Sequence, residues 1–248
     1  PGLCYLTPYK EYKDNGIARV LNFAGLVPPE QSRFFNWSKP FVQLETTRGC
    51  FNTCAFCVSG GEKPVRTLSI ESIRRRLQLI HAHGIKNVRV LDRTFNYNPR
   101  RAKELLRLFL EFHPDIRFHL EIHPALLSEE LKEELSLLPK GLLHLEAGIQ
   151  SLREPVLEKS RRMGKLSDAL DGLRFLCALP NMETHADLIA GLPLYHLHEI
   201  FEDVRTLAEY AAGEIQLESL KLLPGTEMRR RAEAVSYTHL TLPTICSV

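Results

Sequence analysis

Apolar and polar positions repeat with two different periods along the chain beyond residue 40. Short runs rich in aliphatic and β-branched residues, typical of strands, separate longer segments in which apolar residues recur every three or four positions, typical of amphipathic helices. The segment 69–84 shows the helical pattern clearly: Ser69 can cap its start, Ile73 and Leu77 share one face, and Gly84 can end it. The pattern therefore predicts an α/β protein.

The strand-like runs and the helical runs alternate. Strands are predicted at 41–47, 87–91, 117–122, 142–149, 184–190 and 214–223. Helices are predicted at 69–84, 100–112, 128–138, 154–179 (broken) and 198–212. Successive strands start about 25–45 residues apart, the length of one right-handed crossover between parallel strands. An open doubly wound sheet and a partial barrel both fit this pattern.

Length and charge narrow the class of protein. A chain of 248 residues can bury a sizeable core without disulfides. Its 32 basic and 30 acidic residues leave no charge excess that would favour nucleic acid or an anionic membrane as a partner. No apolar run approaches the length of about 18 residues that a membrane span requires. We therefore expect a cytoplasmic protein with reduced cysteines.

The two ends of the chain differ from the middle. Residues 1–40 are expected to form an irregular lead-in segment, and the start at Pro1 predicts that coding sequence upstream is missing. Residues 235–248 hold no charged side chain and resemble sequencing-adapter read-through, so we expect a non-native tail with few contacts to the rest. Cys246 and His239 are accordingly left out of any predicted site.

Three cysteines, Cys50, Cys54 and Cys57, follow the first predicted strand in a loop that also contains Gly49 and Asn52. Structural zinc takes four ligands, usually as two close pairs, and here a distant histidine would have to complete the set. An iron–sulfur cluster also takes thiolate ligands, and a cubane on three cysteines leaves one iron open. Two hypotheses follow: a cluster enzyme, or a non-catalytic protein that holds zinc or senses redox state.

Carboxylates recur where the predicted strands end. Five of the six strands carry one at or near the C-terminal end, among them Asp92, Glu121, Glu146 and Asp187. Site residues of parallel barrels collect at that end of the strands. The recurrence favours a polar site on one rim.

The spacing CxxxCxxC, with Phe56 before the last cysteine, resembles the signature of the radical S-adenosylmethionine (radical SAM) superfamily. The resemblance implies a partial (β/α)6 barrel of the TIM type over residues 41–234. It also implies a [4Fe-4S] cluster on Cys50, Cys54 and Cys57, with S-adenosylmethionine chelating the open iron. In that family a one-electron donor of the flavodoxin or ferredoxin type reduces the cluster, which then cleaves the cofactor to methionine and a 5′-deoxyadenosyl radical.

The resemblance extends beyond the cysteines. GIQSLREPVLEKSRR is similar to a segment of the oxygen-independent coproporphyrinogen oxidase and methylthiotransferase branches, in which a glutamine and an arginine hold the ribose and the methionine carboxylate. Cofactor contacts are thereby implied at Phe56, Asp92, Thr94, Glu121, Gln150, Arg162 and Asp187. Substrate contacts are predicted at Arg93, Tyr97, His123 and Lys221. His144, flanked by leucines, is predicted to be structural.

The motifs ETTRGC, LDRTFNYN, FHLEIHPALL, LEAGIQS, HADLIAGLP and LKLLPGT follow one another as in cobalamin-dependent-type radical SAM proteins. In such proteins a cobalamin-binding domain precedes the barrel, and residues 1–40 are too few to form one. Cobalamin-assisted methyl transfer is therefore one expected reaction. The sequence names no substrate.

Overall fold

A computed structural model describes residues 2–16, 25–210 and 213–232, and contacts between residues divide the chain into two units, 1–35 and 36–248. In the first unit β1 (Cys4–Leu6) pairs with β2 (Tyr12–Asp14) as an antiparallel hairpin. The 3-10 helix η2 (Pro29–Gln31) follows later in the same unit. The lead-in segment thus contains a hairpin that its very short strands did not reveal. The predicted tail, 235–248, lies outside the described residues.

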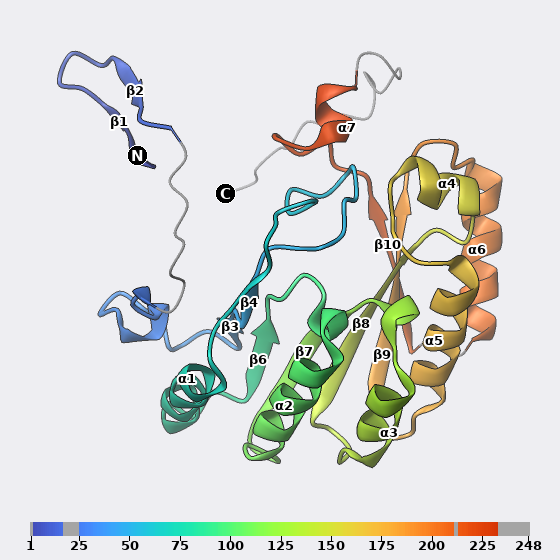
Figure 1. The fold of residues 1–248 in the computed structure, drawn as a ribbon, viewed down its shortest axis with the longest axis horizontal. Coiled ribbons are helices and arrows are strands. Elements are labelled where there is room, and N and C mark those ends of the chain that lie inside the picture. The colour runs from blue at the N-terminus through green and yellow to red at the C-terminus, as the bar shows by residue number, and fades with distance from the viewer. Residues whose placement is uncertain (1, 17–24, 211–212, 233–248) are drawn as a thin grey trace. The chain divides into compact units, whose positions relative to one another are not determined.

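The second unit is built on a parallel sheet (Figure 1). Its strands are β3 (Val42–Leu44), β6 (Asn87–Val90), β7 (Arg117–Ile122), β8 (Leu143–Gln150), β9 (Glu183–Ala190) and β10 (Glu214–Ser219). Each strand pairs in parallel with the next one along the chain, so the spatial order equals the sequence order. A doubly wound sheet would reverse its order at a switch point. The structure therefore confirms the partial barrel.

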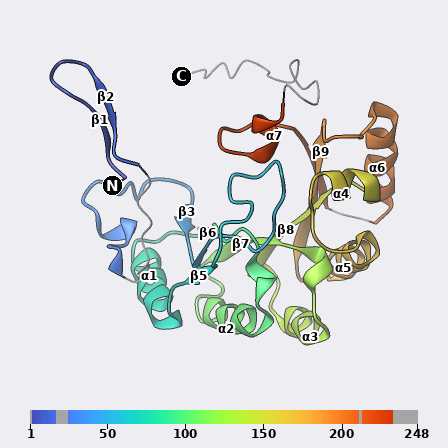
Figure 2. The ribbon, with the colours of Figure 1, turned by 45° about the horizontal axis from the view of Figure 1, so that its top comes forward.

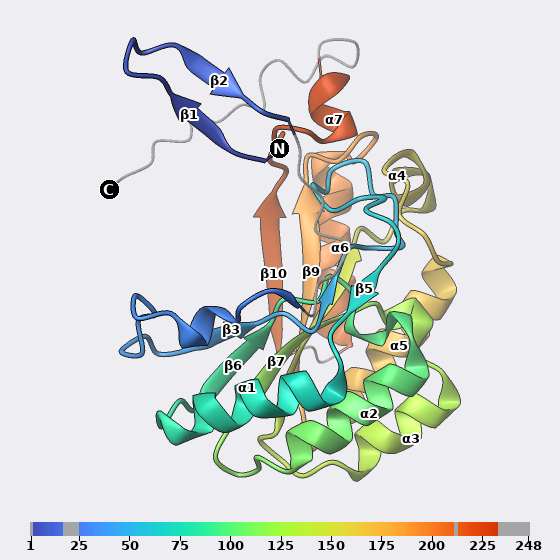
Figure 3. The same ribbon diagram turned by 60° about the vertical axis from the view of Figure 1, so that its left-hand side comes forward.

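Helices cover one face of this sheet, as Figures 2 and 3 show. They are α1 (Ile70–Ala82), α2 (Pro99–Leu110), α3 (Glu129–Leu137), α5 (Leu166–Ala178) and α6 (Leu197–Glu209). The short α4 (Glu154–Lys159) and α7 (Glu227–Arg230) lie near the C-terminal ends of the strands. Ser69 caps α1 by accepting a hydrogen bond from the Ser72 amide, as its position predicted. No helix among the described residues is long and apolar enough to cross a membrane.

The main core lies between the sheet and these helices. Successive side chains of a strand point to opposite faces, and along β7 every second residue is buried. Phe118 belongs to the buried set and stacks on Phe109 of α2, with ring centroids 4.0 Å apart. The alternate residues, including His119 and Glu121, face the concave side of the sheet and are only half-buried. The strand pattern thus produces an apolar outer face and a polar inner face.

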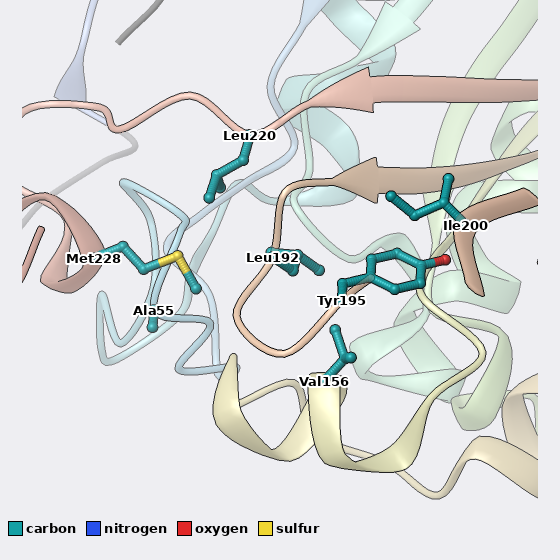
Figure 4. Packing of buried hydrophobic residues seen from close by; sticks show 7 residues of the cluster. All are labelled: Ala55, Val156, Leu192, Tyr195, Ile200, Leu220 and Met228. Atoms are coloured by element: carbon teal, nitrogen blue, oxygen red, sulfur yellow. The ribbon is translucent and has the colours of Figure 1, made fainter. Parts of the chain in front are cut away.

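A smaller apolar cluster lies at the C-terminal end of the barrel (Figure 4). It consists of Ala55, Val156, Leu192, Tyr195, Ile200, Leu220 and Met228. These residues come from the cysteine loop, α4, the connection from β9 to α6, α6 itself, the end of β10 and α7. The cluster therefore attaches the cysteine loop to the barrel.

Two predicted strands are shorter than expected. The run 41–47 forms β3 only as far as Leu44, and β4 (Thr47–Arg48) pairs instead with β5 (Arg66–Thr67) across the base of the cysteine loop. The run 214–223 ends at Ser219, after which Leu220 enters the smaller apolar cluster. In both places the chain leaves the sheet and forms a loop at the C-terminal end of the barrel.

The Phe109–Phe118 stack generates a prediction for stability. Phe118→Ala should lower the free energy of unfolding by about 3–5 kcal/mol, because it removes a fully buried ring and leaves a cavity. Phe201→Ala on α6 is the matched control, since that ring is 57% exposed. Urea unfolding of the cluster-free protein measures both, and equal losses would contradict the placement of the core.

Candidate functional site

The three cysteines occupy the loop between β4 and β5. Cys50 and Cys54 are buried, whereas Cys57 is half-buried. The loop is closed by its own backbone, because the Cys50 amide donates to the Glu62 carbonyl at 3.0 Å. Gly49 makes this closure possible: its φ is +100°, and a Cβ there would lie 2.5 Å from the Glu62 oxygen. The backbone conformation of the cysteine loop is therefore fixed by contacts within the loop.

Backbone contacts fix this loop on the barrel rim. The Ala55 amide donates to the Ser160 carbonyl at 2.9 Å, just after α4. The Ala55 carbonyl accepts from the Met228 amide of α7 at 3.0 Å. The buried Asn52 side chain accepts from the Met163 amide at 3.3 Å. Both edges of the thiol loop are thus held by segments far away in the sequence.

Asp92 positions the start of the loop. Its carboxylate accepts hydrogen bonds from the Thr46 and Thr47 amides, each at 2.8 Å, and from the Thr46 hydroxyl. The side chain is fully buried, and this burial raises its pKa while the hydrogen bonds from Thr46 and Thr47 lower it. Asp92 lies outside the lining of the nearby pocket. The structure thus gives Asp92 a supporting position, and its predicted cofactor contact stays a prediction.

A cavity of about 70 Å³ opens at the C-terminal ends of β6 to β9. It is lined by Arg93, Thr94, Glu121, Ile122, His123, Glu146, Gly148, Gln150, Arg162 and Asp187. Most of the residues predicted to contact cofactor, and two of those predicted to contact substrate, therefore come together in one place. Their individual roles stay predictions.

Three further predicted residues lie outside this lining. Phe56 packs against the smaller apolar cluster. Tyr97 is half-buried in the 3-10 helix η3 (Phe95–Tyr97). Lys221 is exposed and its Nζ lies 3.1 Å from Glu218. The predicted cofactor and substrate contacts of these three residues stay predictions.

Arg162 connects the pocket to the thiols. Its Nη2 donates to the Gly148 carbonyl at 2.7 Å, and its Nη1 lies 3.9 Å from the sulfur of Cys54. Burial raises the pKa of the Cys54 thiol, whereas the guanidinium charge of Arg162 lowers it. A fixed cation beside the thiols favours their ionised form.

Gly148 and Gln150 shape the pocket wall. The pairing of β8 with β9 is irregular between these two residues, and Gln150 has a φ of +75°. A Cβ on Gly148 would lie 2.6 Å from Gln150 Nε2 and 3.3 Å from Arg162 Nη2. The glycine therefore leaves the space into which the glutamine and the arginine converge.

The pocket carboxylates differ in protonation. Burial, followed by the nearby Glu146 charge, raises the pKa of Glu121 to about 7. The same two causes raise the pKa of Asp187 to about 9. The His119 imidazole, 2.8 Å from Glu146, holds the pKa of that carboxyl well below its usual range. At neutral pH Glu146 therefore carries charge and Asp187 keeps its proton.

His123 presents a neutral ring to the pocket. Its Nε2 donates to the Met163 carbonyl at 3.0 Å, and burial lowers its pKa to about 3. Among the described residues its buried Nδ1 has no hydrogen-bond partner. Asn96 clamps the His123 backbone through two hydrogen bonds of 2.9 Å, a contact that the sequence pattern did not indicate. His123 therefore offers the pocket an acceptor.

Comparison with known proteins agrees with this geometry. The profile of the radical SAM superfamily matches residues 44–207. The chain therefore belongs to the radical SAM superfamily, a class of enzymes, as the cysteine motif predicted.

Among curated relatives, the ribosomal protein uS12 methylthiotransferase RimO of Moorella thermoacetica is 28% identical over 190 residues, which are 71% of this chain and 43% of that protein. A tRNA-2-methylthio-N(6)-dimethylallyladenosine synthase of Herpetosiphon aurantiacus is 25% identical over 77% of this chain and 46% of that protein. The chain spans less than half the length of these relatives.

Solved structures share the fold. The radical S-adenosylmethionine methyltransferase TsrM of Kitasatospora setae, solved with cobalamin and a [4Fe-4S] cluster, superposes with a TM-score of 0.66 at 22% identity, over 78% of this chain and 37% of that chain. Coproporphyrinogen III oxidase HemN of Escherichia coli superposes with a TM-score of 0.58 at 17% identity, over 77% and 46%. These likenesses support the partial barrel.

The raised pKa of Glu121 predicts a pH effect on stability. The folded protein binds the proton of the Glu121 carboxyl more tightly than the unfolded chain does. The contribution of this proton to the free energy of unfolding is therefore fully present below the ordinary pKa of 4.5 and is lost as the pH rises through about 7. Glu121→Gln removes the titration. The free energy of unfolding of the variant relative to the parent should therefore increase by about 1–2 kcal/mol between about pH 5 and pH 8, after allowance for solvent screening.

Denaturant unfolding of the cluster-free proteins at both pH values measures this difference. Glu130→Gln is the control, because the Glu130 side chain on α3 is 74% exposed. A difference between Glu121→Gln and the parent that stays constant with pH would show that the carboxyl is ionised throughout this range.

Proposed function

We propose that Cys50, Cys54 and Cys57 bind a [4Fe-4S] cluster, that S-adenosylmethionine occupies the adjoining pocket, and that the pair initiates radical chemistry on a substrate. The observation that carries this proposal is the thiol loop held on the rim with Arg162 beside it. Three cysteines are one ligand short of the four that structural zinc takes, whereas a cubane held by three thiolates keeps one iron open for the cofactor.

The residues of the pocket have separate tasks in this proposal. Arg162 binds the methionine carboxylate, for which a guanidinium fork is suited. Gln150 and the carboxyls of Glu121 and Asp187 bind the hydroxyl and amino groups of the nucleoside. When bound and reduced, the cluster supplies the electron that cleaves the sulfonium of the cofactor. The electron comes from a flavodoxin- or ferredoxin-type donor in the cytoplasm.

The reaction that follows is proposed to be transfer of a methyl group, with cobalamin as its carrier. Two likenesses support this choice. TsrM is named a methyltransferase and contains cobalamin. The cobalamin-dependent radical enzyme OxsB covers 96% of this chain with a TM-score of 0.58. Methylthio transfer is the second candidate, because RimO and related relatives bear that name. Mass spectrometry of the product distinguishes an added methyl group from an added methylthio group.

Cluster content tests the first step. Anaerobic reconstitution should yield about four irons and four sulfides per chain. Alanine at Cys50, Cys54 or Cys57 should abolish this uptake, whereas Cys4→Ala and Cys177→Ala should leave it intact, because those thiols lie outside the loop. Iron, sulfide and zinc analysis provides the measurement. One zinc without sulfide would contradict the proposal and favour a zinc or redox-sensing protein.

Arg162→Ala tests the cofactor site. The variant should keep the cluster but bind S-adenosylmethionine about a hundredfold or more weakly, because a buried carboxylate loses its charged partner. The neighbouring Arg161 is unsuitable as a control variant, because its side chain forms an ion pair with Glu227. Lys159→Ala at the exposed end of α4 is the better match. Titration of the reduced cluster followed by electron paramagnetic resonance gives the affinities, and unchanged binding by Arg162→Ala would refute the contact.

A further inference from the structure

Histidines and carboxylates gather on the concave face of three adjacent strands. Parallel pairing sets Glu146 of β8 beside His185 of β9, and His119 of β7 beside His144 of β8. Because alternate side chains of a strand share one face, Asp187 lies one step further along the same side of β9. The register alone thus brings these polar side chains to one part of the barrel interior.

Three donor atoms of this group converge on one point. One ligand atom each from His119, Glu146 and His185 lies within 4.8 Å of the other two. The Nε2 of His119 lies 2.8 Å from Glu146 Oε2, and the Nε2 of His185 lies 3.7 Å from the same oxygen. Ligands on a first-row metal ion, at about 2.1 Å from it, are about 3–3.5 Å apart. Small side-chain adjustments would therefore complete a metal site.

A buried nitrogen of His185 without a hydrogen-bond partner is a second indication that this group binds a ligand. Its side chain is only 6% exposed, and among the described residues its Nε2 has no hydrogen-bond partner. The Oδ1 of Asp187, 3.5 Å away, is likewise buried and without a partner. Buried polar atoms are normally satisfied by protein, water or an ion. Two such atoms face the same space.

The supporting residues resemble those around histidine ligands. Nδ1 of His185 lies 2.7 Å from Nε2 of His144, which fixes the ring with its other nitrogen toward Glu146. Nδ1 of His144 receives a hydrogen bond from Arg117 at 3.0 Å and lies 3.7 Å from Glu183. An ion on His185 would displace the ring proton from Nε2. His144 would then give its Nε2 proton to Nδ1 of His185 and take up the displaced proton at its own Nδ1. That nitrogen would lose the bond from Arg117 and would turn toward Glu183, now 3.7 Å away.

We propose that His119, Glu146 and His185 form a binding site for one divalent first-row cation, Zn²⁺ or Fe²⁺. Two imidazoles and one carboxylate suit both ions, and such sites keep positions open for a further ligand. Here the open positions face the cavity that Glu146 and Asp187 help to line. The ion would hold an oxygen or nitrogen donor of the substrate below the cofactor. The site is separate from the cysteine loop. Cation binding does not depend on the function proposed for that loop, whereas the contact with the substrate rests on that function.

A second cavity supplies a route for the ion. It measures about 320 Å³ and lies toward the N-terminal ends of β8 and β9. His144, His185, Glu183 and Glu214 are part of its lining. His185 thus lines this cavity, while Glu146, its partner in the pairing of β8 with β9, lines the smaller cavity at the rim.

The test must separate this site from the thiols, which also bind zinc. In a Cys50→Ser, Cys54→Ser and Cys57→Ser background, the folded full chain should retain one equivalent of Zn²⁺ after dialysis. Adding His119→Gln, Glu146→Gln or His185→Gln should weaken Zn²⁺ binding by about a hundredfold or more, and adding His144→Gln by about ten- to a hundredfold. His198→Gln, on an exposed position of α6, should leave binding unchanged.

A second measurement covers variants that fail to fold. The folded serine background is titrated with Co²⁺ alone, and its visible absorption should show the weak bands of nitrogen and oxygen ligands without thiolate charge transfer. Competition with Fe²⁺ and with Zn²⁺ then ranks the two ions. No metal retained by the folded serine background, no cobalt bands in it, equal binding by the ligand variants, or equal loss in His198→Gln would each overturn the proposal.

Discussion

The carboxylate of Asp92 accepts hydrogen bonds from the amides of Thr46 and Thr47, and this contact decides where the chain leaves the first barrel strand. Those two amides are withdrawn from the ladder between β3 and β6, so the strand ends early and the thiol loop begins at the rim. Arg101 completes the junction by donating to the Thr46 and Leu68 carbonyls at 3.1 and 2.7 Å. This junction holds the start of the loop, and the bonds of Asn52 and Ala55 hold the rest of it beside the pocket.

The order of the elements could be predicted from the sequence, because the two hydrophobic periods are local properties of the chain. The choice between a partial barrel and a doubly wound sheet could not, since both contain the same βαβ units. It was the family resemblance that favoured the barrel, and the spatial order β3 to β10 confirmed it. Strand ends such as Leu44 and Ser219 were missed, because the partners that stop them lie far away in the sequence.

The pocket was predicted better than its supports. Gln150 and Arg162 lie twelve positions apart in a recognisable segment, and both line the same cavity. Asp92 occupies the expected stretch, but it is buried and is not part of the lining of that cavity. His144 was predicted to be structural, and this stays a prediction. Its leucine neighbours are buried, whereas its half-buried imidazole contacts His185, because neighbours along a strand lie on opposite faces.

The polar interior has a physical cost that shapes what the barrel can do. Buried carboxylates and imidazoles lose hydration, and they persist only where protons, hydrogen bonds or ions compensate. Glu146 is compensated by His119, and Asp187 by retaining its proton. His185 Nε2 is left without such a partner among the described residues. A barrel that only enclosed an apolar substrate would gain nothing from this arrangement. The interior therefore suits a polar group or the cation proposed here better than an apolar one.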